Sequence, residues 1–81
     1  MKNNTSLEEH MENILVETLR AIGKPSKIID VARWAYLLYK DELRPYQWQY
    51  DLRWSASHSD KVISKKVSNY SLWSLAAWEG K

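Results

Sequence analysis

The stretch of residues 6–25 constrains the fold of this chain most, because it specifies an amphipathic helix together with both of its ends. Four apolar residues recur at the spacing of one helical face, namely Met11, Leu15, Leu19 and Ile22. Ser6 and Glu9 have the spacing of a capping box. Gly23 suits the left-handed backbone of a helix C-terminus, and Pro25 blocks continuation. The sequence therefore predicts a helix from Ser6 to Ile22.

Such a helix must pack against further apolar surface, and a chain of 81 residues has room for one domain. Five Trp and five Tyr supply that surface, since each buried aromatic side chain removes about 150–250 Å² from water. We expect a single domain over residues 6–78, with a disordered N-terminus over residues 1–5 and a frayed tail over residues 79–81.

Composition excludes several classes of protein. The chain has no Cys, so it has no disulfide and no thiolate metal site, and a reducing, cytoplasmic location is expected. No apolar run approaches the roughly 20 residues of a membrane span. The polar segment Met1–Ser6 lacks the apolar core of a signal peptide. We therefore expect no membrane partner.

A second helix is expected to begin after Ser26, its predicted N-cap, and to run through Tyr39. One of its faces carries Ile28, Ala32, Ala35 and Tyr39. Trp34 and Leu37 project from the opposite side, which leaves two interpretations. Either the third helix or the C-terminal segment covers them, or they form a dimer contact.

A third helix is expected from Pro45 to about Ser57, because proline suits the first helical position. It has two apolar faces, one with Trp48, Leu52 and Ala56, the other with Tyr46, Tyr50 and Trp54. Only one face can be the core of so small a domain, and we assign the Leu52 face to it. The tyrosine-bearing face is then free for a partner.

The C-terminal third predicts a β-hairpin. Val62–Val67 is rich in β-branched residues, Ser68-Asn69 is a turn signal because Asn tolerates positive φ, and Leu72–Leu75 is the returning strand. Residues 76–78 extend that strand or begin a helical turn. The expected fold is mainly α with a small β-hairpin, a winged helix-turn-helix of three helices and a C-terminal wing.

The segment Leu19–Leu75 resembles the small winged helix-turn-helix domains of the HARE-HTH type. The first helix ends in "LRAIGKP", with Leu19, Ala21, Gly23, Lys24 and Pro25. Ile28-Ile29-Asp30 opens the second helix, the third carries Pro45 and Leu52, and the wing runs over Val62–Leu75 with "NYSLWSL" on its return.

This resemblance implies a role seen in transcription regulators, the general transcription machinery and DNA-modification or restriction proteins. The third helix would contact duplex DNA, and the wing would touch the backbone or the minor groove. Two features depart from the family pattern: the third helix has few basic residues, and Ser68-Asn69 replaces the expected glycine at the wing turn. Many winged helices also serve only as protein–protein modules.

Side chains suited to DNA gather in the C-terminal half, where residues 44–81 carry six Lys/Arg against three Asp/Glu. Gln and Arg can pair with adenine and guanine, while Lys, Ser and Tyr can bind phosphates. The candidate DNA-binding residues are Arg44, Tyr46, Gln47, Gln49, Tyr50, Arg53, Ser57, Lys61, Lys65 and Lys66. The alternative is a solvated helix face and a strand edge protected by lysines.

Catalysis finds no support in the sequence. His10 and His58 lie far apart in polar contexts, and no P-loop, dinucleotide fingerprint or nucleophile elbow is present. We expect no enzyme activity, no metal, no cofactor and no small-molecule substrate.

Two hypotheses remain. In the first, the chain is a small DNA-binding regulator, and its size suggests a mobile element such as a phage. In the second, it binds itself or another protein without nucleic acid, through Trp34 and Leu37 or through the third-helix aromatics, including Trp54.

Overall fold

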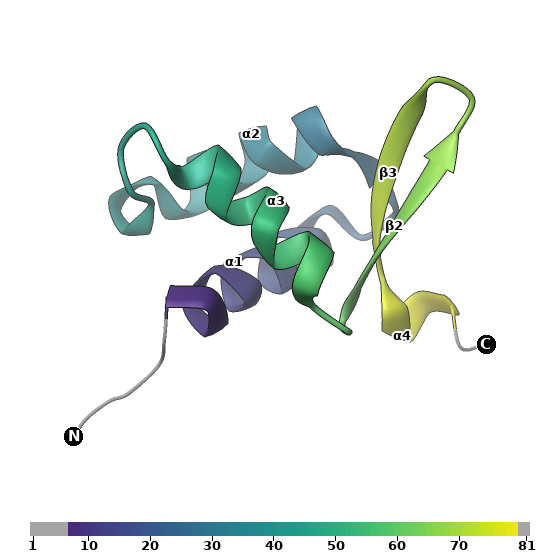
Figure 1. Cartoon of the computed structure of the whole chain (residues 1–81), viewed down its shortest axis with the longest axis horizontal. Helices are drawn as coiled ribbons and strands as arrows, with labels where there is room; N and C mark the ends of the chain where they lie inside the picture. The colour runs from purple at the N-terminus through teal and green to yellow at the C-terminus, as the bar shows by residue number, and fades with distance from the viewer. Residues whose placement is uncertain (1–6, 80–81) are drawn as a thin grey trace.

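The computed structural model describes residues 7–79, with three helices set beside a small antiparallel sheet (Figure 1). In chain order the elements are α1 (Leu7–Ile22), β1 (Ser26–Lys27), α2 (Ile28–Tyr39), the 3-10 helix η1 (Lys40–Glu42), α3 (Trp48–His58), β2 (Val62–Val67), β3 (Tyr70–Leu75) and α4 (Ala76–Glu79). Three helices followed by the β2–β3 hairpin make a winged helix-turn-helix-like arrangement, as predicted. The disorder expected for residues 1–5, the Ser6 cap and residues 80–81 of the tail expected to fray over 79–81 lie outside the described residues. Glu79, the first residue of that tail, was predicted wrongly, because it belongs to α4 and its carboxylate pairs with Lys65.

Helix α1 lies at the centre of the fold and packs against α2, α3 and β3. Leu15 and Leu19 of its predicted apolar stripe are fully buried. Gly23 follows the helix with a φ of +87°, and its amide donates to the carbonyl of Leu19 at 2.8 Å. The predicted end of the helix is therefore confirmed, in the conformation that favours glycine.

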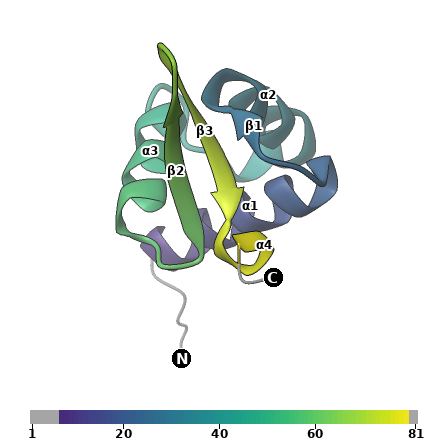
Figure 2. The same cartoon turned by 90° about the vertical axis from the view of Figure 1, so that its right-hand side faces the viewer.

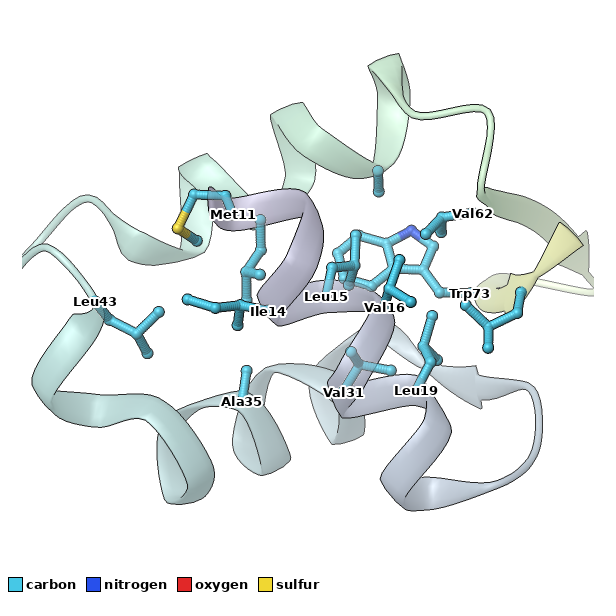
Figure 3. Packing of buried hydrophobic residues seen from close by; sticks show 13 residues of the cluster. Met11, Ile14, Leu15, Val16, Leu19, Val31, Ala35, Leu43, Val62 and Trp73 are labelled. Atoms are coloured by element: carbon cyan, nitrogen blue, oxygen red, sulfur yellow. The ribbon is translucent and has the colours of Figure 1, made fainter. Parts of the chain in front are cut away.

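The core joins the helices to the sheet (Figure 3). The α1 stripe meets Val31 and Ala35 of α2, Leu43 of the following loop, and Trp73 of β3. Trp73 is 3% exposed, so its indole brings a large apolar area into a small core. Leu52 and Ala56 of α3 are also buried, which confirms the face assigned to the core.

The sheet has the order β1-β3-β2, with both pairs antiparallel (Figure 2). The hairpin runs in register from Val62 opposite Leu75 to Val67 opposite Tyr70. Of the two interpretations for residues 76–78, the helical turn is the one observed, as α4. In the described part of the chain, no helix has the length and apolarity to cross a membrane.

Ser26 is not the N-cap of α2, and this prediction was wrong. Ser26 and Lys27 form β1 and pair with Trp73 and Leu72 of β3. The Ser26 hydroxyl donates to the carbonyl of Lys24 at 2.9 Å, and Lys27 precedes α2 without a side-chain cap. The backbone N–H and C=O groups after Pro25 form hydrogen bonds with the open edge of β3, and this pairing takes the place of a local helix cap.

Helix α3 begins at Trp48, three residues later than the predicted start at Pro45. Tyr46 has a φ of +68°, which no residue of a right-handed helix can adopt. The amide of Trp48 donates to the carbonyl of Arg44 at 3.0 Å, so residues 44–48 form a separate turn. Tyr46 consequently does not share a helical face with Tyr50.

Two further expectations need correction. The interpretation that other elements cover Trp34 and Leu37 was wrong, because they are 43% and 74% exposed. The rest of the fold covers only one side of α2, the side on which Val31 and Ala35 are buried. In the hairpin turn, Ser68 rather than Asn69 takes the positive φ, at +55°.

Candidate nucleic-acid interface

Helix α3 is divided into an inner and an outer face. The inner positions are Trp48, Asp51, Leu52, Ser55 and Ala56, which are buried or partly buried at the spacing of one helical face. The outer positions are all exposed and comprise Gln49, Tyr50, Arg53, Trp54, Ser57 and His58. Four of the predicted DNA-binding residues, Gln49, Tyr50, Arg53 and Ser57, therefore lie together on the surface of one helix.

Arg44 holds the start of this helix in place. Its Nε and one terminal nitrogen donate to the two carboxylate oxygens of Asp51 at 2.9 and 2.8 Å. The same terminal nitrogen donates to the side-chain oxygen of Gln47 at 3.3 Å. The hydrogen bond to Asp51 raises the pKa of the Arg44 guanidinium above its ordinary value. Arg44 and Gln47 are thus engaged inside the protein, although both remain exposed.

The wing separates its two adjacent lysines onto opposite sides of the sheet. Residues paired across an antiparallel ladder share a face, and successive residues alternate between faces. Ser64 pairs with buried Trp73, so Lys66, two residues further along, lies on the side that faces the helices. Lys65 lies on the other side, where its Nζ is 3.0 Å from a carboxylate oxygen of Glu79 in α4.

A hollow of about 280 Å³ lies between α2, α3 and the sheet. Gln49 and Arg53 of α3 line it together with Ile29 of α2 and Trp73 of β3. The hollow shows that the Trp73 side of the sheet is the side on which Arg53 lies. Lys66 and Arg53 are therefore on the same side of the molecule, and neither is in an ion pair within residues 7–79.

The opposite flank of α3 is acidic and tied to α1. The His58 ring stacks on Trp54 with centroids 3.8 Å apart, and its Nδ1 lies 2.8 Å from the carbonyl of Trp54. The hydroxyl of Ser59 donates to Glu12 of α1, and the Nζ of Lys61 lies 4.0 Å from the same carboxylate. This flank is unfavourable for phosphates, which limits the candidate interface to the wing side of α3.

The predicted site residues thus divide into three groups. Gln49, Tyr50, Arg53, Ser57 and Lys66 lie on one exposed surface, which we call the α3–wing surface. Tyr46 is fully exposed in the turn before α3. Arg44, Gln47, Lys61 and Lys65 have partners within the protein.

Sequence reasoning missed Lys27, which stands on the exposed edge strand β1. Its Nζ lies 4.8 Å from the centre of the Tyr70 ring, so it joins the edge strand β1 to the central strand β3 near the wing turn. No local pattern could have found it, because β1 is only two residues long and its pairing partner is distant in the chain.

Among residues 7–79 no group of three His, Cys, Asp or Glu side chains could hold a metal ion. The fold and the exposed polar surface of α3 define a winged-helix-like domain. Comparison of the chain with family models, curated proteins and solved structures finds no match.

Proposed function

We propose that the protein binds duplex DNA, with α3 in the major groove and the wing against the phosphate backbone. The observation that carries this proposal is the α3–wing surface, where Arg53 and Lys66 are exposed on the same side of the fold without an ion-pair partner in the described chain. The resemblance to HARE-HTH domains agrees with this role and with a small regulator.

The chemistry of α3 suits base recognition. Arg53 has the donor fork that pairs with guanine, and Gln49 can pair bidentately with adenine. One helical turn separates these two side chains, so both reach the floor of the groove from a single helix. The hydroxyls of Tyr50 and Ser57 stand beside them and can fix the helix against phosphates.

The ion pairs that the protein makes within itself reduce the electrostatic contribution to DNA binding. Lys61 and Lys65 are held by carboxylates, so Lys66 and Arg53 carry most of the free positive charge of this surface. These two cations can neutralise about two phosphates, so we expect a slope no steeper than about −2 for log K against log salt concentration. Binding should be weak without base readout.

The experiment is fluorescence anisotropy with labelled duplexes of varied sequence, at 50–200 mM salt. Arg53→Ala should weaken binding at least tenfold and reduce the preference between sequences. Lys66→Ala should weaken binding to all duplexes and make the salt slope shallower by about one. The matched control is Lys65→Ala, one residue away on the other side of the sheet, which should change affinity much less.

Absence of duplex binding at 50 mM salt contradicts the proposal. So does a binding curve that Arg53→Ala and Lys66→Ala leave unchanged. In that event the second candidate, a winged-helix module for protein partners, is favoured by five large apolar side chains exposed on α2, namely Ile29, Trp34, Tyr36, Leu37 and Leu38.

A further inference from the structure

The hollow between α2, α3 and the sheet has an apolar wall and two polar side chains at its mouth. Gln49 and Arg53 are its polar residues, and both are exposed. The rest of its wall is apolar and comprises Ile28, Ile29, Ala32, Leu52 and Trp73. A bound water needs two to four polar partners, which such a wall does not offer, so an apolar group is the better occupant.

The core holds this space open. Leu52 and Trp73 are 1% and 3% exposed, so close packing beneath the hollow prevents them from turning into it. Ala32 of α2 is partly buried, and its side chain ends at the methyl group. A longer side chain at this position would fill the hollow, which makes Ala32 the residue that leaves room for a ligand.

The size of the hollow limits what it can hold. Its volume is about 280 Å³, near the lower end of the roughly 300–1,000 Å³ of ligand pockets. An apolar cavity of about 150 Å³ is enough for one benzene molecule. The hollow therefore suits a small ligand whose apolar part is no larger than two fused rings.

The charge at the mouth indicates the polar end of this ligand. Arg53 has no ion-pair partner within residues 7–79, and none of the described residues that line the hollow is acidic. A guanidinium binds a carboxylate through two parallel hydrogen bonds, and the Gln49 amide can donate beside it. Lys66 lies on the same side of the sheet and adds to the positive potential.

We propose that this hollow binds a small aromatic carboxylate, with its rings against the apolar wall and its carboxylate on Arg53. The ligand is bound and not converted, because no residue that lines the hollow is a nucleophile or a general acid. Since the site is shallow and the ligand small, we expect a dissociation constant on the order of 0.1 mM. The inference does not depend on DNA binding.

Isothermal titration calorimetry of the full chain with 2-naphthoate, without DNA, tests the proposal. The neutral 2-naphthamide should bind at least fivefold more weakly, and acetate, which has no rings, should not bind measurably. Arg53→Met keeps the apolar stem of the side chain and should remove the preference for the carboxylate over the amide. Arg20→Met is the matched control, because Arg20 is an exposed arginine that does not line the hollow.

Three further variants test the location. Ala32→Leu should weaken the binding of both naphthalene compounds at least tenfold, because the added side chain occupies the hollow. Ala21→Leu, at an exposed position of α1, is the matched control and should change nothing. Leu37→Ser should also change nothing, since Leu37 lines a neighbouring groove on the outer face of α2 and not this hollow. Circular dichroism checks that each variant folds.

Four results would overturn the proposal. They are no heat of binding up to 5 mM 2-naphthoate, an equal affinity for 2-naphthamide, a preference for the carboxylate that Arg53→Met retains, and a loss of binding with Leu37→Ser as large as the loss with Ala32→Leu. The last result would place the ligand on the outer face of α2 instead.

Discussion

At the scale of single residues, Arg44 shows how a candidate DNA contact can serve the fold. Asp51 is 6% exposed on the inner face of α3, and its carboxylate receives two hydrogen bonds from the Arg44 guanidinium. Removing the guanidinium would leave a buried carboxylate without its charged partner, which is costly in a small domain.

We therefore predict that Arg44→Ala lowers the midpoint of thermal unfolding by about 5–10 °C. Asp51→Asn in the same background should recover part of this loss, since a neutral amide is cheaper to bury than an unpaired carboxylate. Circular dichroism during heating measures both. An Arg44→Ala variant as stable as the parent would show that the pair contributes nothing.

Tyr46 combines a strained backbone with full exposure. Its φ of +68° is an outlier for a bulky side chain, and nothing in the core compensates because the ring is in solvent. Tyr46→Asn should raise the thermal midpoint by about 2–5 °C, since Asn tolerates this conformation. Tyr50→Asn, within α3, is the control and should give no such gain. A fall in stability with Tyr46→Asn would contradict the strain argument.

At the scale of elements, the wing turn carries a similar mismatch. In the two-residue loop between Val67 and Tyr70, a positive φ at Ser68 alone is the pattern of a type II′ turn, which prefers Gly at that position. Ser68→Gly should raise the free energy of unfolding by about 0.5–1 kcal/mol.

The neighbouring substitution gives the contrast. Asn69→Gly should lower the free energy of unfolding by about 0.5 kcal/mol. Asn69 does not have a positive φ, so glycine removes no strain there, and it increases the conformational entropy of the unfolded chain. Chemical denaturation of the two variants measures the difference. If Asn69→Gly proves the more stabilising, the turn is of another type.

The helices and strands differ in how far they can be predicted from the sequence. Helix α1, its end at Gly23 and the strand Val62–Val67 carry their signals locally, so their types and bounds were predictable. The strand β1 was not, because two residues have no periodicity and their partner Trp73 is remote. The turn over residues 44–47 was misread because Pro45 is equally compatible with a helix start and a turn.

The candidate site was predictable only in part, because which side chains stay free depends on strand register and on contacts between residues remote in the chain. Residue type placed Gln49, Arg53 and Lys66 among the candidates, and the fold brings them to one side. Residue type could not separate Lys65 from Lys66, because the distinction depends on sheet register and on Glu79 of α4. That these side chains contact DNA stays a prediction.

At the scale of the whole molecule, stability depends on the contacts of α1, whereas Leu37 on the outer face of α2 contributes little to the folded protein. Leu15 is completely buried and Leu37 is 74% exposed, so the same truncation has different consequences at the two positions. Leu15→Ala should lower the free energy of unfolding by about 2–5 kcal/mol, a large share of the 5–15 kcal/mol of an ordinary domain.

Leu37→Ala should change the free energy of unfolding by less than about 0.5 kcal/mol, because this side chain already lies in water in the folded protein. Chemical denaturation of the two variants beside the parent measures the contrast. A loss with Leu37→Ala as large as the loss with Leu15→Ala would contradict the division of the apolar residues into a core on α1 and an exposed face on α2.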